Sequence, residues 1–167
     1  LYQTSIARHS LRQQGPGGVK LFDLALDVGI QQRQRLRRSL HSALEADELS
    51  LVFQPIEPCG TSIPRKMEAL LRWDEPELGA ISPLLFIPVA EESGLIVPLG
   101  RWVLASACKA AAQWSGDAVV SVNVSIHQIL GGDLLVDVNA ALATSGLAPE
   151  RLEIEITESV FSHDIDL

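Results

Sequence analysis

The sequence predicts an α/β fold in which helices separate the strands of a parallel sheet. Short apolar segments alternate with longer amphipathic ones, and this alternation is typical of βαβ units. An apolar content of 47% supplies the buried core that a disordered chain would lack. The strands are expected at Leu49–Phe53, Met67–Leu71, Ala118–Val124 and Leu152–Thr157.

The expected helices are marked by their spacing and by their capping residues. Leu36, Leu40 and Leu44 recur every four residues within a Pro-free segment, 24–48, which favours an amphipathic helix. Ser or Asp before the first turn, Pro within it and Gly after the last residue are typical of helix ends. These signals predict three further helices, from Ser82-Pro83 to Gly94, from Pro98 to Gly116, and from Asp133 to Gly146. Residues 1–14 are expected to end a helix, and Val19–Phe22 to form a short strand.

Charge and cysteine content narrow the class of protein. The net charge is −8, divided into +5 for residues 1–38 and −13 for residues 39–167, so we expect no binding to long nucleic acid. No apolar run approaches the roughly 18 residues of a membrane span, and no signal-peptide pattern follows Leu1. Cys59 and Cys108 form no C-x-x-C pair, which fits a reducing compartment. We therefore expect a cytoplasmic protein, with membrane tethering through upstream segments left open.

In each of the three later strands, the residues that point to one face are mostly polar and those that point to the other are apolar. Glu68 and Arg72 share one face of the second strand, Asn123 lies on the polar face of the third, and Glu153 and Glu155 lie on that of the fourth. If the sheet is open on one side, these side chains are simply solvated. If it closes into a barrel, inward carboxylates need a partner or a metal ion. Carboxylate and amide oxygens suit Mg²⁺ or Mn²⁺.

Seven segments, in order and with matching spacing, resemble the EAL domain family. They are Gln54-Pro55-Ile56, Glu68–Trp73, Ser82-Pro83, Phe86–Ile96, Leu99–Leu104, Asn123-Val124-Ser125 and Glu153–Ser159. The resemblance implies a partial TIM-like (β/α) barrel of the EAL type, truncated after about half the barrel, with an N-terminal linker helix. It also implies hydrolysis of cyclic di-GMP to linear pGpG, assisted by Mg²⁺ or Mn²⁺.

The resemblance also assigns roles to individual residues. Glu68, Asn123 and Glu155 resemble the family's metal ligands, and Arg72 resembles its phosphate contact. Three further residues complete the implied site: Gln54 and Leu70 along the ligand groove, and Glu158 as the anchor of a catalytic loop. A metal pair would activate water, and an Arg fork pairs with phosphate oxygens.

The segments before the predicted sheet divide into two expected parts. Residues 1–23 resemble the tail of a GGDEF (diguanylate cyclase) domain through Gly15–Asp23. Residues 24–48 then form a linker helix, and residues 49–167 the EAL part. This order implies upstream GGDEF and sensor domains in a parent chain.

The sequence departs from the family in two respects. Pro64-Arg65-Lys66 replaces a turn of small apolar residues and Gly, which puts the first hairpin in doubt. The family's paired aspartates and catalytic lysine would lie beyond Leu167, so the isolated chain is expected to be inactive and prone to aggregate. Two alternatives stay open: a degenerate EAL domain that binds cyclic di-GMP without cleaving it, and a homodimer formed through the Arg-rich helix at 33–44.

Overall fold

The computed structural model describes residues 24–46, 48–56 and 66–156, with side chains from residue 31 onward. The chain forms two compact units, 1–36 and 37–167, and helix α2 (Leu24–Ala43) runs through their boundary. The predicted helix end at 1–14 and strand at Val19–Phe22 lie outside the described residues. The fold described below is that of the second unit.

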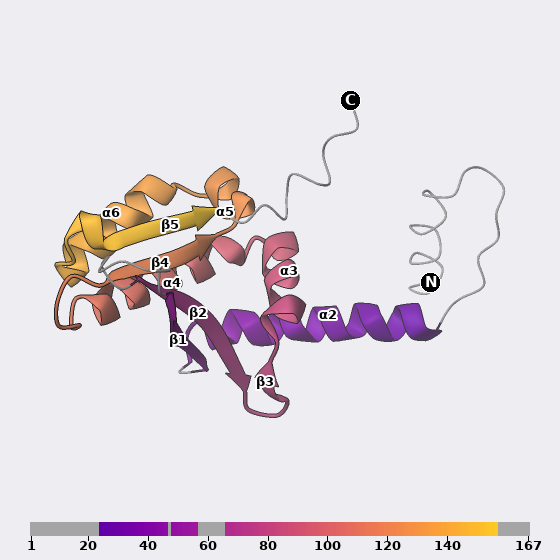
Figure 1. Ribbon diagram of the computed structural model, residues 1–167. Coiled ribbons are helices and arrows are strands. Elements are labelled where there is room, and N and C mark those ends of the chain that lie inside the picture. Colours follow the sequence, from indigo (N-terminus) through magenta and orange to yellow (C-terminus); the bar gives the residue numbers. More distant parts are fainter. Residues whose placement is uncertain (1–23, 47, 57–65, 157–167) are drawn as a thin grey trace. The chain divides into compact units, whose positions relative to one another are not determined.

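Five strands of the second unit form one sheet, whose strand order is β1-β2-β4-β5, with β3 paired to β2 (Figure 1). Their bounds are β1 Leu49–Ile56, β2 Lys66–Glu75, β3 Gly79–Ile81, β4 Val119–Val124 and β5 Leu152–Ile156. Strands β2, β4 and β5 run parallel, which confirms the predicted parallel sheet. Strand β1 pairs antiparallel with β2 and forms the hairpin that the sequence left in doubt.

The helices confirm most of the capping signals. Their bounds are α3 Pro83–Ser93, α4 Ile96–Ala111, α5 Ile126–Gly131 and α6 Leu134–Ser145, with a 3₁₀ turn at Pro149–Arg151. Gly94 and Gly146 end α3 and α6 with φ of 75° and 69°, a left-handed conformation that favours Gly. Asp133 caps α6 by accepting a hydrogen bond from the Val136 N–H. Ser82 takes the cap position of α3, but its side chain makes no capping hydrogen bond.

Other predicted boundaries are wrong. Helix α2 ends at Ala43 rather than at residue 48, and a turn bonded to the Ser42 carbonyl follows it. Helix α4 begins at Ile96, ahead of Pro98, because the first helical turn does not need the N–H that Pro lacks. It ends at Ala111, and Gly116 serves a later turn instead. Strand β3 and helix α5 were not predicted, since both are too short to show a period.

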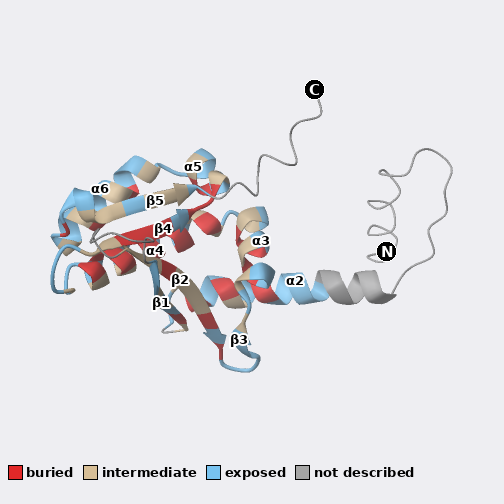
Figure 2. Ribbon diagram, viewed as in Figure 1, coloured by how far each residue is buried: buried red, intermediate tan, exposed pale blue. Residues whose placement is uncertain are grey.

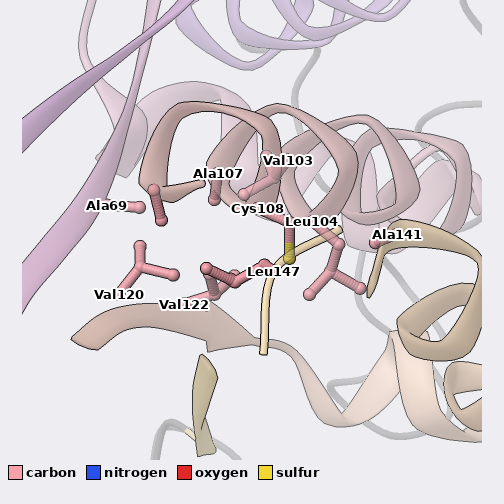
Figure 3. Close-up of a cluster of buried hydrophobic side chains, with 10 residues drawn as sticks. Ala69, Val103, Leu104, Ala107, Cys108, Val120, Val122, Ala141 and Leu147 are labelled. Atoms are coloured by element: carbon pink, nitrogen blue, oxygen red, sulfur yellow. The ribbon is translucent and has the colours of Figure 1, made fainter. Parts of the chain in front are cut away.

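The face of the sheet that carries the alternating apolar side chains packs against α4 and α6. Val120 and Val122 of β4 point toward α4, whose buried face includes Leu104 and Cys108 (Figure 3). Ala141 of α6 completes this cluster, and Figure 2 shows the buried residues along β4 and α4. This packing covers one face of the sheet with helices. The residues of opposite parity therefore lie on the other face.

Helix α3 is fixed to β2 by an aromatic pair. Trp73 and Phe86 are almost fully buried, and their ring centroids lie 5.4 Å apart in an edge-to-face arrangement. The Trp73 indole N–H also donates to Glu48 ahead of β1. This pair holds α3 beside the carboxyl end of β2.

Within the described part of the chain, no helix is both long enough and apolar enough to span a membrane.

Candidate active site

The face of the sheet opposite the helices carries a polar cluster. Lys66, Glu68 and Arg72 of β2 share one parity, opposite to that of Ala69 in the core. Ser121 and Asn123 of β4, and Glu153 and Glu155 of β5, have the parity opposite to that of the buried valines and Ile154. Because β2, β4 and β5 are adjacent and parallel, these side chains gather on one face.

Two predicted ligands are in direct contact. Asn123 Nδ2 donates a hydrogen bond to Glu68 Oε1 over 2.7 Å, joining β4 to β2. Asn123 is also the register partner of Glu155 on β5. The structure therefore brings Glu68, Asn123 and Glu155 together from three neighbouring strands.

Glu155 is held by two donors. Its Oε1 accepts a hydrogen bond from Lys66 Nζ at 2.7 Å and another from Ser121 Oγ at 2.6 Å. These bonds, that from Lys66 first, lower the pKa of Glu155 below its usual value because they favour the carboxylate. Lys66 also pairs with Glu153, and this hydrogen bond, followed by the one to Glu155, raises the pKa of the ammonium group. Glu155 is therefore a carboxylate at neutral pH.

The turn after β4 fixes the position of Asn123. Ser125 follows the strand and caps α5 by accepting a hydrogen bond from the His127 N–H. Its hydroxyl donates to Glu91 of α3 at 2.5 Å. Asn123 is thus the last residue but one of β4 and lies two residues before Ser125, which is tied to both α3 and α5. This restricts where its amide can point.

A cavity of about 390 Å³ opens beside the middle of β2 and the carboxyl end of β4. Predicted residues Leu70, Arg72 and Asn123 line it, together with mostly apolar side chains of α3 and α4. One guanidinium nitrogen of Arg72 donates to the Leu71 carbonyl at 2.9 Å, which leaves the rest of the fork for another acceptor. The cavity therefore combines an apolar wall with a few polar and charged side chains, including Arg72 and Glu91, the usual composition of a small-molecule site.

The remaining predicted residues are placed less fully. Gln54 is exposed on β1 and is the register partner of Glu68, so it shares the polar face, but it does not line the cavity. Glu158 lies outside the described residues. Sequence reasoning missed Lys66 and Ser121 as members of the cluster. Lys66 lies two residues before Glu68, and Ser121 two residues before Asn123, so each points to the same strand face as that ligand. This spacing was the signal that could have found them.

The donor set fits a hard divalent cation. Glu68 and Glu155 supply carboxylate oxygens, and Asn123 supplies an amide oxygen once its nitrogen is engaged by Glu68. The cluster also attracts positive charge, because the ammonium group of Lys66 contacts Glu155. In the described ranges, no three His, Cys, Asp or Glu side chains converge as a metal site, so the candidate set depends on the Asn amide.

Most of the chain matches a known protein family. The sequence profile of the EAL domain matches residues 37–166. The chain belongs to the EAL domain family. The α/β fold with its parallel sheet agrees with solved EAL structures, which confirms the predicted fold class.

Curated relatives contain the same EAL segment within longer proteins. The bifunctional diguanylate cyclase/cyclic di-GMP phosphodiesterase MucR of Pseudomonas aeruginosa is 37% identical over 166 residues, covering 96% of this chain and 24% of that protein. The cyclic di-GMP phosphodiesterase PdeR of Escherichia coli is 33% identical over 173 residues, covering 98% and 26%. The chain thus spans about a quarter of the length of these relatives.

Solved EAL structures share the fold. The MucR phosphodiesterase in complex with cyclic di-GMP superposes with a TM-score of 0.68 at 40% identity, over 79% of this chain and 55% of that one. The FimX EAL domain from Pseudomonas aeruginosa, bound to cyclic di-GMP, gives 0.65 at 31% identity, over 72% and 49%. The chain therefore corresponds to about half of a solved EAL domain.

Proposed function

We propose that this chain forms part of the active site of a phosphodiesterase that hydrolyses cyclic di-GMP to linear pGpG. The observation that carries the proposal is the convergence of Glu68, Asn123 and Glu155 from three adjacent strands on one polar face. Relatives named as cyclic di-GMP phosphodiesterases, and a MucR phosphodiesterase complex with the same ligand, support this substrate.

Glu68, Asn123 and Glu155 would hold the divalent cation, Mg²⁺ or Mn²⁺. When bound, such a cation stabilises developing negative charge and lowers the pKa of coordinated water. The chain's own residues would position the substrate. Arg72 would pair with a phosphate in the cavity, which Leu70 also lines, and Gln54 would contact the ligand from the polar face outside the cavity. Glu158 would anchor a catalytic loop. We also propose that a longer protein containing this chain supplies further metal ligands and an upstream GGDEF domain. We propose a cytoplasmic location for that protein.

The test uses a protein that carries this chain within a complete EAL domain. Asn123→Ala should lower Mg²⁺ affinity and cut turnover by about tenfold or more while leaving the fold intact. Circular dichroism checks the fold, and release of pGpG from cyclic di-GMP at limiting Mg²⁺ measures turnover. Asn139→Ala, at an exposed position on α6, is the matched control. Unchanged turnover at limiting Mg²⁺ would contradict the assignment of Asn123.

A receptor that binds cyclic di-GMP without cleaving it is the second candidate. The ion pair between Lys66 and Glu155 favours it, because an internal cation already contacts one proposed ligand. The two functions differ in the fate of the ligand. Intact cyclic di-GMP recovered from the protein after incubation with excess Mn²⁺ would select the receptor, and pGpG would select the enzyme.

A further inference from the structure

Lys66 connects two strands that do not neighbour each other. It opens β2, and its ammonium group pairs with Glu153 and Glu155 on β5, on the far side of β4. Ser121, fully buried on β4, lies between these strands and contributes only a short side chain. A small residue at this position leaves the sheet surface open for the long lysine side chain to cross.

Lys66 reaches Glu155 from the amino end of the sheet. In the strand register, Lys66 is level with Val119, whereas Glu155 is level with Asn123. Asn123 and its hydrogen-bonded partner Glu68 both lie further along their strands than the level of Lys66 and Val119. Lys66 and Ser121 both donate to Glu155 Oε1, so these two hydrogen bonds converge on one oxygen of the carboxylate.

We propose that Lys66 is an internal counter-cation that competes with the divalent ion for Glu155 and thereby sets the metal affinity of the site. The inference rests on the proposed function, because it takes Glu155 as a metal ligand. A fixed positive charge beside a ligand oxygen repels an incoming divalent ion and shares the negative charge that would bind it. The same charge gives both Glu153 and Glu155 a partner when no metal is bound. Without it, β5 would present two like charges on one face.

Competition and structural support predict opposite results for a variant. A residue that merely supports Glu155 would weaken metal binding when it is lost. A competing cation does the reverse, and its removal tightens binding. Lys66 would thus act on the metal ion through Glu155. Whether its removal tightens or weakens metal binding distinguishes competition from structural support.

The experiment measures Mn²⁺ binding to the purified full-length protein by the electron paramagnetic resonance signal of free Mn²⁺. Lys66→Met removes the charge and keeps the side-chain length, whereas Lys66→Gln retains hydrogen-bonding capacity without charge. Both should lower the Kd for Mn²⁺ by about tenfold or more. Lys66→Arg, which keeps the charge, should bind Mn²⁺ as the wild type does. Lys109→Met, at an exposed position of α4 on the helical side, is the matched control and should leave the Kd unchanged.

Thermal unfolding supplies a second readout. Without metal, Lys66→Met should unfold at a lower temperature than Lys109→Met, because two carboxylates lose their partner. Added Mn²⁺ should raise the melting temperature of Lys66→Met more than that of the wild type. If Lys66→Met does not fold, Lys66→Gln carries the same test.

The outcomes separate this inference from the proposed function. If the wild type binds Mn²⁺ and the uncharged variants bind equally well or more weakly, competition by Lys66 is overturned and the metal site stands. If neither the wild type nor any variant binds Mn²⁺, the metal site of the proposed function is overturned, and the role of Lys66 with it.

Discussion

Asn123 on β4 donates a hydrogen bond to Glu68 on β2, with 2.7 Å between Nδ2 and Oε1. This bond crosses between parallel strands whose register places Glu68 opposite Ser121, one step below Asn123 on the same face. It engages the amide nitrogen and leaves the amide oxygen directed elsewhere. One contact therefore fixes a carboxylate and an amide of the proposed metal site in the same small region.

Asn123→Asp should destabilise the metal-free protein and gain stability from metal. The substitution replaces a donor to Glu68 with a second carboxylate, so a hydrogen bond worth about 1 kcal/mol becomes a repulsion. Urea unfolding at neutral pH should show the loss, and Mn²⁺ should recover it. Asn139→Asp, exposed on α6, provides the control. Equal stabilities of the two variants in the absence of metal would rule out the hydrogen bond between Asn123 and Glu68.

Arg72→Ala should raise the KM for cyclic di-GMP by about tenfold or more, because charge-assisted bonds to phosphate are among the stronger hydrogen bonds. The kcat should change less than the KM, since Arg72 lines the cavity but is not one of the proposed metal ligands. Arg72→Lys should rescue only part of the loss, because an ammonium group lacks the planar fork. Steady-state kinetics in a complete EAL domain give both constants. A fall in kcat alone would refute a binding role.

Gly100→Ala should destabilise the contact between α4 and α5. A Cβ at Gly100 would lie 2.2 Å from the side-chain Cδ and Oε1 of Gln128, which is 2% exposed. We expect a loss of about 1–3 kcal/mol in the free energy of unfolding from such overpacking. Gln128→Ala should suppress it, so the double variant should be more stable than the two single losses predict. Strict additivity in urea unfolding would contradict the close approach.

Leu104→Ala should cost about 2–5 kcal/mol in the free energy of unfolding, because it opens a cavity in the cluster between α4 and the sheet. Leu104 has no exposed surface, whereas Leu135 on α6 is 71% exposed. Leu135→Ala removes the same atoms and should change stability by less than about 0.5 kcal/mol. Similar losses for the two variants in urea unfolding would show that the core is placed wrongly.

Cys108 should make the stability of the fold decrease at alkaline pH. Burial raises the pKa of its thiol because the thiolate loses solvation. The unfolded chain releases this proton near pH ~8.5 while the folded chain keeps it, so the free energy of unfolding should fall as pH rises above that value. Urea unfolding from pH 8 to 10 should show a shallower slope for Cys108→Ala. Rapid reaction of Cys108 with a thiol reagent in the folded protein would count against its burial.

The dimer hypothesis loses part of its basis in the structure. Leu40, which lies within the Arg-rich helix at 33–44, has no exposed surface within its own unit. Its burial explains the four-residue leucine spacing without a partner, as the helix packs one face against its own chain. Pairing through the remaining residues of the Arg-rich segment stays a prediction.

Local signals determined a large part of this protein. The side-chain period of a strand is fixed by backbone geometry, so the parity of Glu68, Asn123 and Glu155 could be predicted without knowing the strand order. Capping residues act through their own turn, and for this reason Gly94 and Gly146 marked helix ends correctly. The resemblance to EAL domains used the same local strings.

Only the tertiary structure decided which of these local features meet. The antiparallel pairing of β1, the place of β4 between β2 and β5, and the reach of Lys66 across Ser121 to Glu155 all join residues distant in sequence. No local propensity encodes such contacts, because they follow from packing the apolar parity of the sheet against α4 and α6. That packing leaves the polar parities of three strands on one face, where their charges must pair with one another or with a cation.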